Sequence, residues 1–154
     1  EGSPYKDAFK GGVFTHSFLN VNDYHRFHTP VAGKLVEKRV LKGKMALDVT
    51  KNPATGKLEP VDGTGYQFTQ TRGLIVLQTE TLGLVAVLPI GMAQVSSVNL
   101  TPDLRAELRK GEEFGYFLFG GSDIITLFQA DKVRFTATEG THYPQGQKIG
   151  MAIR

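Results

Sequence analysis

Ser122 is the residue of this sequence whose surroundings are hardest to explain by packing alone. It follows the pair Gly120-Gly121, between two apolar stretches at 114–119 and 124–128. Glycine and serine are good turn formers, so a plain turn between two strands is one interpretation. A second interpretation is chemical, because two glycines permit positive φ angles and leave space around the Gly121–Ser122 peptide bond. The Ser122 hydroxyl can then attack the Gly121 carbonyl, and β-elimination from the resulting ester would leave a pyruvoyl group and release ammonia.

Two of the chain's four histidines, His25 and His28, stand close together in the run Asp23–Pro30. Histidine is the side chain that gains and loses a proton near neutral pH, so the pair is a candidate for acid and base catalysis. A structural interpretation is equally open, in which one ring pairs with the nearby aspartate and the other caps a loop. The spacing makes a poor zinc site, because His16 and His142 supply no third ligand at a recognisable interval.

Candidate substrate contacts lie near these two motifs. An arginine ahead of an apolar strand, Arg72, could bind a carboxylate or phosphate bidentately, although a surface arginine at a strand start is the commoner case. The run Gly91–Ser97 follows another apolar strand, and its small residues either bring backbone N–H groups close to a ligand or form a bulge. The residues that we expect to contact substrate are Arg72, Met92, Ser96, Phe119 and Gly120.

The elements that would position these residues are mostly short β-strands. Eighteen glycines and seven prolines, with frequent β-branched residues and phenylalanine, indicate strands joined by tight turns. We expect a half-buried strand within 11–18, another within 33–40, and a buried hairpin of 74–77 and 84–88 at the centre of the core. The two apolar stretches around Ser122 form a second apolar pair.

Helix signals are few. The stretch Thr101–Leu108 has a capping residue, a proline at the first helical position and good helix formers, so it predicts one short helix. The stretch 48–65 has no periodicity and predicts a surface loop. The turn at Pro30–Leu35 resembles those of the hinged half-barrels in biotinyl and lipoyl carrier domains, but no hairpin matches the one that bears the carriers' modified lysine. We therefore expect a mostly-β fold, a compact barrel or sandwich resembling the barrel-sandwich hybrid of carrier domains, with one or two short helices.

Composition limits the class of protein. The 154 residues suffice for a single domain, 1–154, and an apolar content of 40% with a charged content of 21% is ordinary for a globular chain. The absence of cysteine excludes disulfides, thiolate metal sites and cysteine nucleophiles. The net charge of +3 is spread along the chain, so we expect no nucleic-acid partner. No apolar run is long enough for a membrane helix, and the first residues, Glu1–Pro4, indicate a fragment or a processed chain.

The motifs belong to a wider pattern of four blocks, namely Phe9–Phe14, Asp23–Gly33, Pro89–Ser96 and Lys110–Ser122. In order and approximate spacing, these blocks resemble the phosphatidylserine decarboxylase family over nearly the whole chain. The family is pyruvoyl-dependent and self-processing, and it includes related soluble L-amino-acid decarboxylases. The most specific feature is the Asp-Tyr-His-Arg-x-His-x-Pro block followed by Gly-Gly-Ser in a β context. The resemblance favours the chemical interpretation of Ser122 over a plain turn.

The resemblance implies a role for each residue of the two central motifs. Ser122 would be the nucleophile of self-cleavage and the precursor of the pyruvoyl cofactor, with the chain divided into 1–121 (the β part) and 122–154 (the α part). His28 matches the family histidine that serves as base for the cleavage, and His25 matches the one that handles substrate. The substrate amine would form a Schiff base with the pyruvoyl ketone, lose CO₂ and be protonated by His25. The segment that holds the family's processing aspartate has no counterpart here, which agrees with a missing upstream part.

Two departures from the family pattern bear on the substrate. Lipid-acting members commonly have threonine or serine after the cleavage serine, and this sequence has Asp123. The block Gly91–Ser96 is closer to relatives that decarboxylate soluble aromatic amino acids. The predicted substrate is phosphatidylserine, through its L-serine head group, or a related amino acid, with aromatic L-amino acids as the alternative. The resemblance also implies a homodimer, and it is compatible with a cytoplasmic protein or with peripheral membrane contact.

The sequence alone leaves two functions of other classes open. A carrier-like barrel could serve as a binding module without enzymatic activity, in which case the chain stays intact and tolerates loss of the Ser122 hydroxyl. A metal hydrolase would use His16, His25 and His28, although the spacing of these residues leads us to expect no metal site.

Overall fold

The central hairpin of the fold is built from two of the most apolar stretches of the chain. In the computed structural model, which describes residues 2–20, 22–43, 49–56, 58–60, 65–92, 97–118 and 122–153, these stretches form β6 (Arg72–Gln78) and β7 (Leu84–Gly91). The two strands pair antiparallel, with Ile75 opposite Val87, so the predicted hairpin is confirmed. Most of their residues are buried because both faces of this part of the sheet are covered, which explains the continuous apolar runs.

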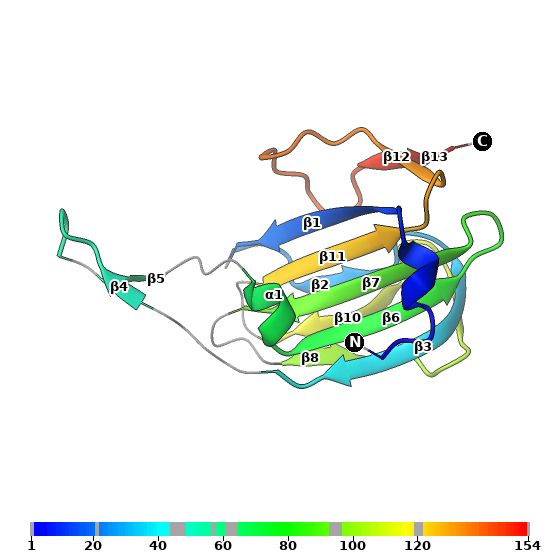
Figure 1. Cartoon of the computed structure of the whole chain (residues 1–154), viewed down its shortest axis with the longest axis horizontal. Helices are drawn as coiled ribbons and strands as arrows, with labels where there is room; N and C mark the ends of the chain where they lie inside the picture. The colour runs from blue at the N-terminus through cyan, green and yellow to red at the C-terminus, as the bar shows by residue number, and fades with distance from the viewer. Residues whose placement is uncertain are drawn as a thin grey trace.

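Four further strands complete the larger sheet, whose order is β1-β11-β7-β6-β3-β9 (Figure 1). The strands predicted within 11–18 and 33–40 correspond to β1 and β3. Strand β11 is an interior strand, because it pairs with β1 on one side and with β7 on the other along its whole length. The bounds are β1 (Val13–Leu19), β3 (Gly33–Leu41), β9 (Glu107–Leu108) and β11 (Ser122–Phe128).

A smaller sheet packs on one face of the larger one, and the main core lies between them. This sheet has the order β2 (Arg26–His28), β10 (Glu113–Phe117) and β8 (Val98–Leu100). Phe27 is fully buried and packs against Phe117 with the two ring centroids 4.5 Å apart. The cluster of buried apolar side chains comprises Phe27, Leu35, Ile75, Leu77, Val87, Val98, Leu108, Phe114 and Phe117.

The strands on either side of the Gly120-Gly121-Ser122 motif do not pair with each other. The sequence predicted them as a second apolar pair, and this prediction is wrong, because β10 belongs to the smaller sheet and β11 to the larger. Ser122 therefore begins a strand at the point where the chain passes from one sheet to the other. The predicted mostly-β class is confirmed, and the architecture is the sandwich, since the sheets of the described residues do not close into a barrel.

The short helix predicted over 101–108 is absent, and these residues make turns that lead into β9. The Arg105 N–H donates to the Leu35 carbonyl at 2.8 Å, and the Leu35 N–H donates to the Ala106 carbonyl at 2.9 Å. Hydrogen bonds to the edge of β3 thus replace the bonds that a helix would make within itself. The helical segments of the described residues are the 3₁₀ helix η1 (Lys6–Phe9) and α1 (Tyr66–Thr69).

Two small hairpins complete the described structure. The stretch 48–65, predicted as a loop, contains β4 (Val49–Lys51) paired with β5 (Leu58–Pro60), and this hairpin extends away from the sandwich (Figure 1). Near the C-terminus, β12 (Val133–Phe135) pairs with β13 (Gly150–Ala152). Among the residues that the structure describes, no helix has the length and apolar character needed to cross a bilayer.

Candidate functional site

Ser122 is fully buried where β11 begins, and its hydroxyl oxygen has no hydrogen-bond partner among the described residues. Its backbone is paired with Leu19 of β1 and with Gly91 of β7. Side chains alternate between the two faces of a strand, and Ile124, two residues on, packs against the core between the sheets. The Ser122 side chain therefore points into the sandwich. A buried polar group without a partner costs about 1–3 kcal/mol, so packing gives no reason for a serine at this position.

Asp123 is equally buried but faces the other side of the larger sheet. Its Oδ2 atom lies 3.2 Å from Nε2 of His16, a half-exposed side chain on β1. His16 stands opposite Ile125 in the strand register, so the contact runs diagonally from β1 to the beginning of β11. The residue directly after the candidate reacting serine thus carries a wholly buried carboxylate, and this carboxylate is paired with a side chain that reaches solvent.

His25 lies at the end of β10 that leads to Ser122. Its carbonyl accepts a hydrogen bond from the Phe117 N–H at 3.0 Å, and the two rings meet edge-to-face with centroids 6.4 Å apart. Its Nδ1 lies 2.5 Å from the Asp23 carbonyl oxygen, and because a carbonyl oxygen only accepts, Nδ1 carries the proton. His25 thus lies beside Phe117, the last residue of β10, which precedes Ser122 by five positions in the sequence.

His28 lies at the other end of β10, opposite Glu113 in the register. Its Nδ1 donates to the Gly111 carbonyl and its Nε2 accepts from the Tyr24 hydroxyl, both at 2.8 Å. A strand rises about 3.3 Å per residue, which puts Glu113 roughly 13 Å from Phe117 along β10. The two histidines of the motif therefore occupy separate positions, and both ring nitrogens of His28 are engaged.

Asp23 connects this motif to the C-terminal part of the chain. One carboxylate oxygen accepts the Asn20 N–H at 2.8 Å, and the other lies 3.3 Å from Nε2 of His142. The aspartate of the motif thus pairs with a distant histidine, in addition to the bond from its carbonyl to His25. Sequence reasoning missed this pair, and the pair of His16 with Asp123, because no spacing rule connects residues so far apart in the chain.

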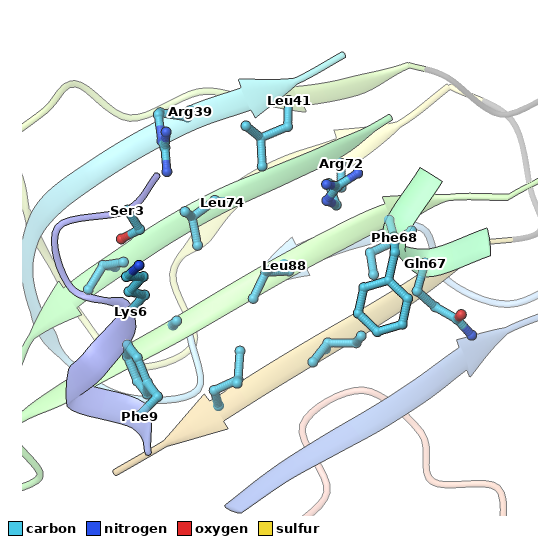
Figure 2. A pocket seen from close by; sticks show the side chains of 15 residues that line it. Ser3, Lys6, Phe9, Arg39, Leu41, Gln67, Phe68, Arg72, Leu74 and Leu88 are labelled. Carbon is cyan, nitrogen blue, oxygen red and sulfur yellow. The ribbon is translucent and has the colours of Figure 1, made fainter. Parts of the chain in front are cut away.

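Arg72 opens β6 on the same face of the sheet as Asp123. It is buried, and one of its terminal nitrogens donates to the Gln70 carbonyl at 2.8 Å. It borders an apolar cavity of about 270 Å³ that is lined in part by residues of η1 and α1 (Figure 2). Because Ser122 points to the opposite face, the structure does not bring the Arg72 and Ser122 side chains together.

The other predicted substrate contacts lie only partly within the described residues. Met92 directly follows β7 and is partly exposed. Ser96, Phe119, Gly120 and Gly121 lie outside the described residues, so their roles stay predictions.

The metal-hydrolase alternative finds no support in the described part of the chain, where no three His, Cys, Asp or Glu side chains gather as metal ligands. The three histidines that it would use are separated. His16 pairs with Asp123 on the outer side of the larger sheet, while His25 and His28 lie at opposite ends of β10.

Comparisons with known proteins give relatives along nearly the whole chain. A family model described as phosphatidylserine decarboxylase matches residues 1–151. The phosphatidylserine decarboxylase proenzyme 2 of Komagataella phaffii is 34% identical over 146 residues, which cover 92% of this chain. The phosphatidylserine decarboxylase proenzymes of Fusobacterium nucleatum and Halorhodospira halophila are 33% and 30% identical, over 81% and 95% of this chain. The chain spans 14%, 39% and 53% of the lengths of these three proteins, respectively.

Proposed function

Because this chain belongs to the phosphatidylserine decarboxylase family, we propose that it forms the core of a self-processing decarboxylase whose pyruvoyl cofactor is made from Ser122. The observation that carries the proposal is the Ser122 hydroxyl, which is buried and has no hydrogen-bond partner among the described residues. A hydroxyl kept in this state fits a group that reacts with its own backbone. The relatives named above are proenzymes, which also supports a chain that matures by cleavage.

The proposed cleavage needs no reagent besides water. The Ser122 oxygen attacks the carbonyl carbon of Gly121, the C–N bond breaks, and the hydroxyl proton passes to the released amine. Removal of the Ser122 α-proton then expels the Gly121 carboxylate from the β-carbon and leaves a dehydroalanine. This group takes up water and loses ammonia. The products are 1–121, which ends in a carboxylate, and 122–154, which begins with a ketone.

The ketone supplies an electron sink for the loss of CO₂ from a substrate that carries an amine. The chain's own residues hold residue 122 for this purpose, since β1 and β7 bind the backbone of β11 on both sides. Burial of residue 122 keeps bulk water away from the reacting atoms. The bond from His25 Nδ1 to the Asp23 carbonyl fixes the ring, and Nε2 is then the nitrogen that exchanges a proton with the substrate.

Two conservative variants separate the proposed roles of the histidines. We expect His25→Gln to cleave normally and then fail to release CO₂, because the proton donor to substrate is lost. We expect His28→Gln to fail in cleavage, the step that the family resemblance assigns to this residue. If His28→Gln cleaves at the wild-type rate and His25→Gln does not cleave, the base for cleavage is His25, the histidine beside Phe117.

Phosphatidylserine is the proposed substrate, through its L-serine head group. The test compares CO₂ release from phosphatidylserine vesicles with release from free tryptophan, phenylalanine and tyrosine, using Ser122→Ala as the control. Release from the vesicles by the wild type alone supports the proposal. CO₂ release from the aromatic amino acids alone would show that the proposed substrate is wrong and that the proposed reaction, a decarboxylation, is right. An uncleaved wild type that behaves like Ser122→Ala in every assay favours a binding module.

A further inference from the structure

We propose that His16 and Asp123 form a positioning bridge that holds the beginning of β11 in place for the self-cleavage at Ser122. The inference rests on the proposed function, because it concerns the rate of that cleavage. We refer to the contact between His16 Nε2 and Asp123 Oδ2, 3.2 Å long, as the His16–Asp123 bridge.

The location of the bridge singles it out among the polar contacts of the described residues. Asp123 is the residue directly after the proposed break and has no exposed side-chain surface, whereas 37% of the His16 side chain is exposed. In the register Asp123 stands opposite Phe18, and His16 stands opposite Ile125. The bridge therefore crosses diagonally between the strands and fixes how far the end of β11 can slide along β1.

The bridge acts through position and not through direct chemistry. Ser122 and Asp123 are consecutive residues of one strand, so their side chains point to opposite faces of the sheet. The Asp123 carboxylate consequently stays away from the Ser122 hydroxyl. The backbone of Asp123, however, is bonded directly to that of Ser122. An attack within the chain requires the oxygen and the carbonyl carbon to be aligned closely, and a shift of about 1 Å can slow such a step by about a hundredfold.

Burial makes polar partners important for the Asp123 carboxylate. A carboxylate taken out of water is strongly destabilising unless an oppositely charged or hydrogen-bonding partner meets it. Arg72 also lies on this face of the sheet, with Ile90 between it and Asp123 in the register. His16 is the partner of Asp123 that comes from the neighbouring strand β1. It therefore links the beginning of β11, where the break is proposed, to a strand of the 1–121 fragment.

The bridge also has a consequence after the cleavage. Asp123 then becomes the first ordinary amino acid of the new chain, directly after the ketone. A new chain end at the beginning of a strand would fray without further contacts. The bridge and the ladder bonds to β1 and β7 keep the ketone in the buried position that Ser122 holds before the break.

The test is a double-mutant cycle on the 154-residue chain with two readouts, the rate at which the 122–154 fragment forms and the thermal unfolding midpoint. The variants are His16→Leu, Asp123→Thr, the double variant and His16→Gln. The amide nitrogen of glutamine can donate to Asp123 as the histidine does, so His16→Gln should cleave within about threefold of the wild type. His16→Leu and Asp123→Thr should each slow the cleavage between about tenfold and about a hundredfold. The double variant should be no slower than either single variant, because all three lose the same contact.

The unfolding midpoint distinguishes positioning from a general loss of stability. His16→Leu leaves a buried carboxylate without its β1 partner and should lower the midpoint more than Asp123→Thr, which removes the charge. Equal cleavage rates in His16→Leu and Asp123→Thr, together with unequal unfolding midpoints, support a positioning role. Cleavage rates that fall in the same order as the midpoints contradict it. If His16→Leu does not fold, the cleavage rates of Asp123→Thr, which loses the contact, and His16→Gln, which keeps it, still test the inference. Wild-type cleavage rates in Asp123→Thr would overturn this inference alone, whereas a wild type that never cleaves overturns the proposed function as well.

Discussion

Gly115 is the position at which the smallest side-chain addition should have the largest effect on the fold around the site. It lies on β10, where it stands opposite Phe27 of β2 and Leu100 of β8. A Cβ atom at Gly115 would be 2.1 Å from the backbone oxygen of Asn99 and 2.8 Å from Cδ2 of Phe27. An ordinary contact lies near 3.5 Å, so Gly115→Ala must separate β10 from β8 by roughly 1 Å or more.

The structure gives an estimate of the cost. Overpacking in a well-packed interior costs about 1–3 kcal/mol, and the upper end applies here because the clash is with backbone and not with a flexible side chain. Replacing glycine by alanine returns about 0.4–1 kcal/mol by restricting the unfolded chain. A net loss of about 2 kcal/mol should lower the unfolding midpoint by roughly 4–8 °C for a domain of this size. Circular dichroism during heating measures this shift.

Gly150→Ala is the matched control, because it makes the same change in a strand. The nearest atoms to a Cβ at Gly150 are the Arg134 oxygen and Cδ1 of Phe135, both at 3.1 Å. A shift of a few tenths of an ångström relieves these contacts, so the free energy of unfolding should change by less than about 0.5 kcal/mol. Equal midpoints for the two variants would refute the reasoning, because β8 and β10 would then not be packed as closely as the structure has them.

Three further experiments test other contacts of the fold. Phe27→Ala should lower the free energy of unfolding by about 3–5 kcal/mol in a urea titration, since the ring is fully buried between Phe114 and Phe117; a loss below about 1 kcal/mol would contradict the core described here. Arg26→Met should change it by less than about 1 kcal/mol in the same titration, because the ion pair that Arg26 makes is largely exposed. After cleavage, 122–154 should co-elute with the rest of the chain in gel filtration without denaturant, because β11 is paired on both sides; separate elution would contradict this placement.

The strands that sequence reasoning predicted correctly are those whose signal is local. The hairpin of β6 and β7 follows from two apolar runs with a short polar turn between them, and both runs are buried on both faces. Strands β1 and β3 follow from turns that bound stretches of mixed polarity. These patterns depend on neighbours in the sequence, so they can be recognised without knowing the partner strands.

The errors arise where tertiary contacts decide. The helix predicted over 101–108 has the right composition, but Leu35 on β3 offers backbone hydrogen-bond partners to Arg105 and Ala106 instead. Strands β10 and β11 have the pattern of a hairpin, yet a short glycine-rich connection can equally carry a chain from one sheet to another. Neither the competing edge nor the change of sheet leaves a trace in the local sequence.

The candidate site shows the same difference between features with a local sequence signal and features that depend on tertiary contacts. Ser122 and the two histidines of the motif are predicted from residue types and from the resemblance to a family, and their roles stay predictions. The separation of His25 from His28 along β10 could not be predicted, because it depends on the direction and pairing of β2. The contact of His16 with Asp123 could not be predicted either, because it depends on the register of β1 and β11.

The intact mass of the purified chain tests the central claim most directly, because it reports on the fate of Ser122 itself. The account predicts two fragments that correspond to 1–121 and 122–154. The second should be lighter, by the mass of one ammonia, than a fragment that begins with serine, and Ser122→Ala should give a single uncleaved mass. A wild-type chain that keeps its full mass with Ser122 unmodified, under conditions where it is folded, would contradict the claim.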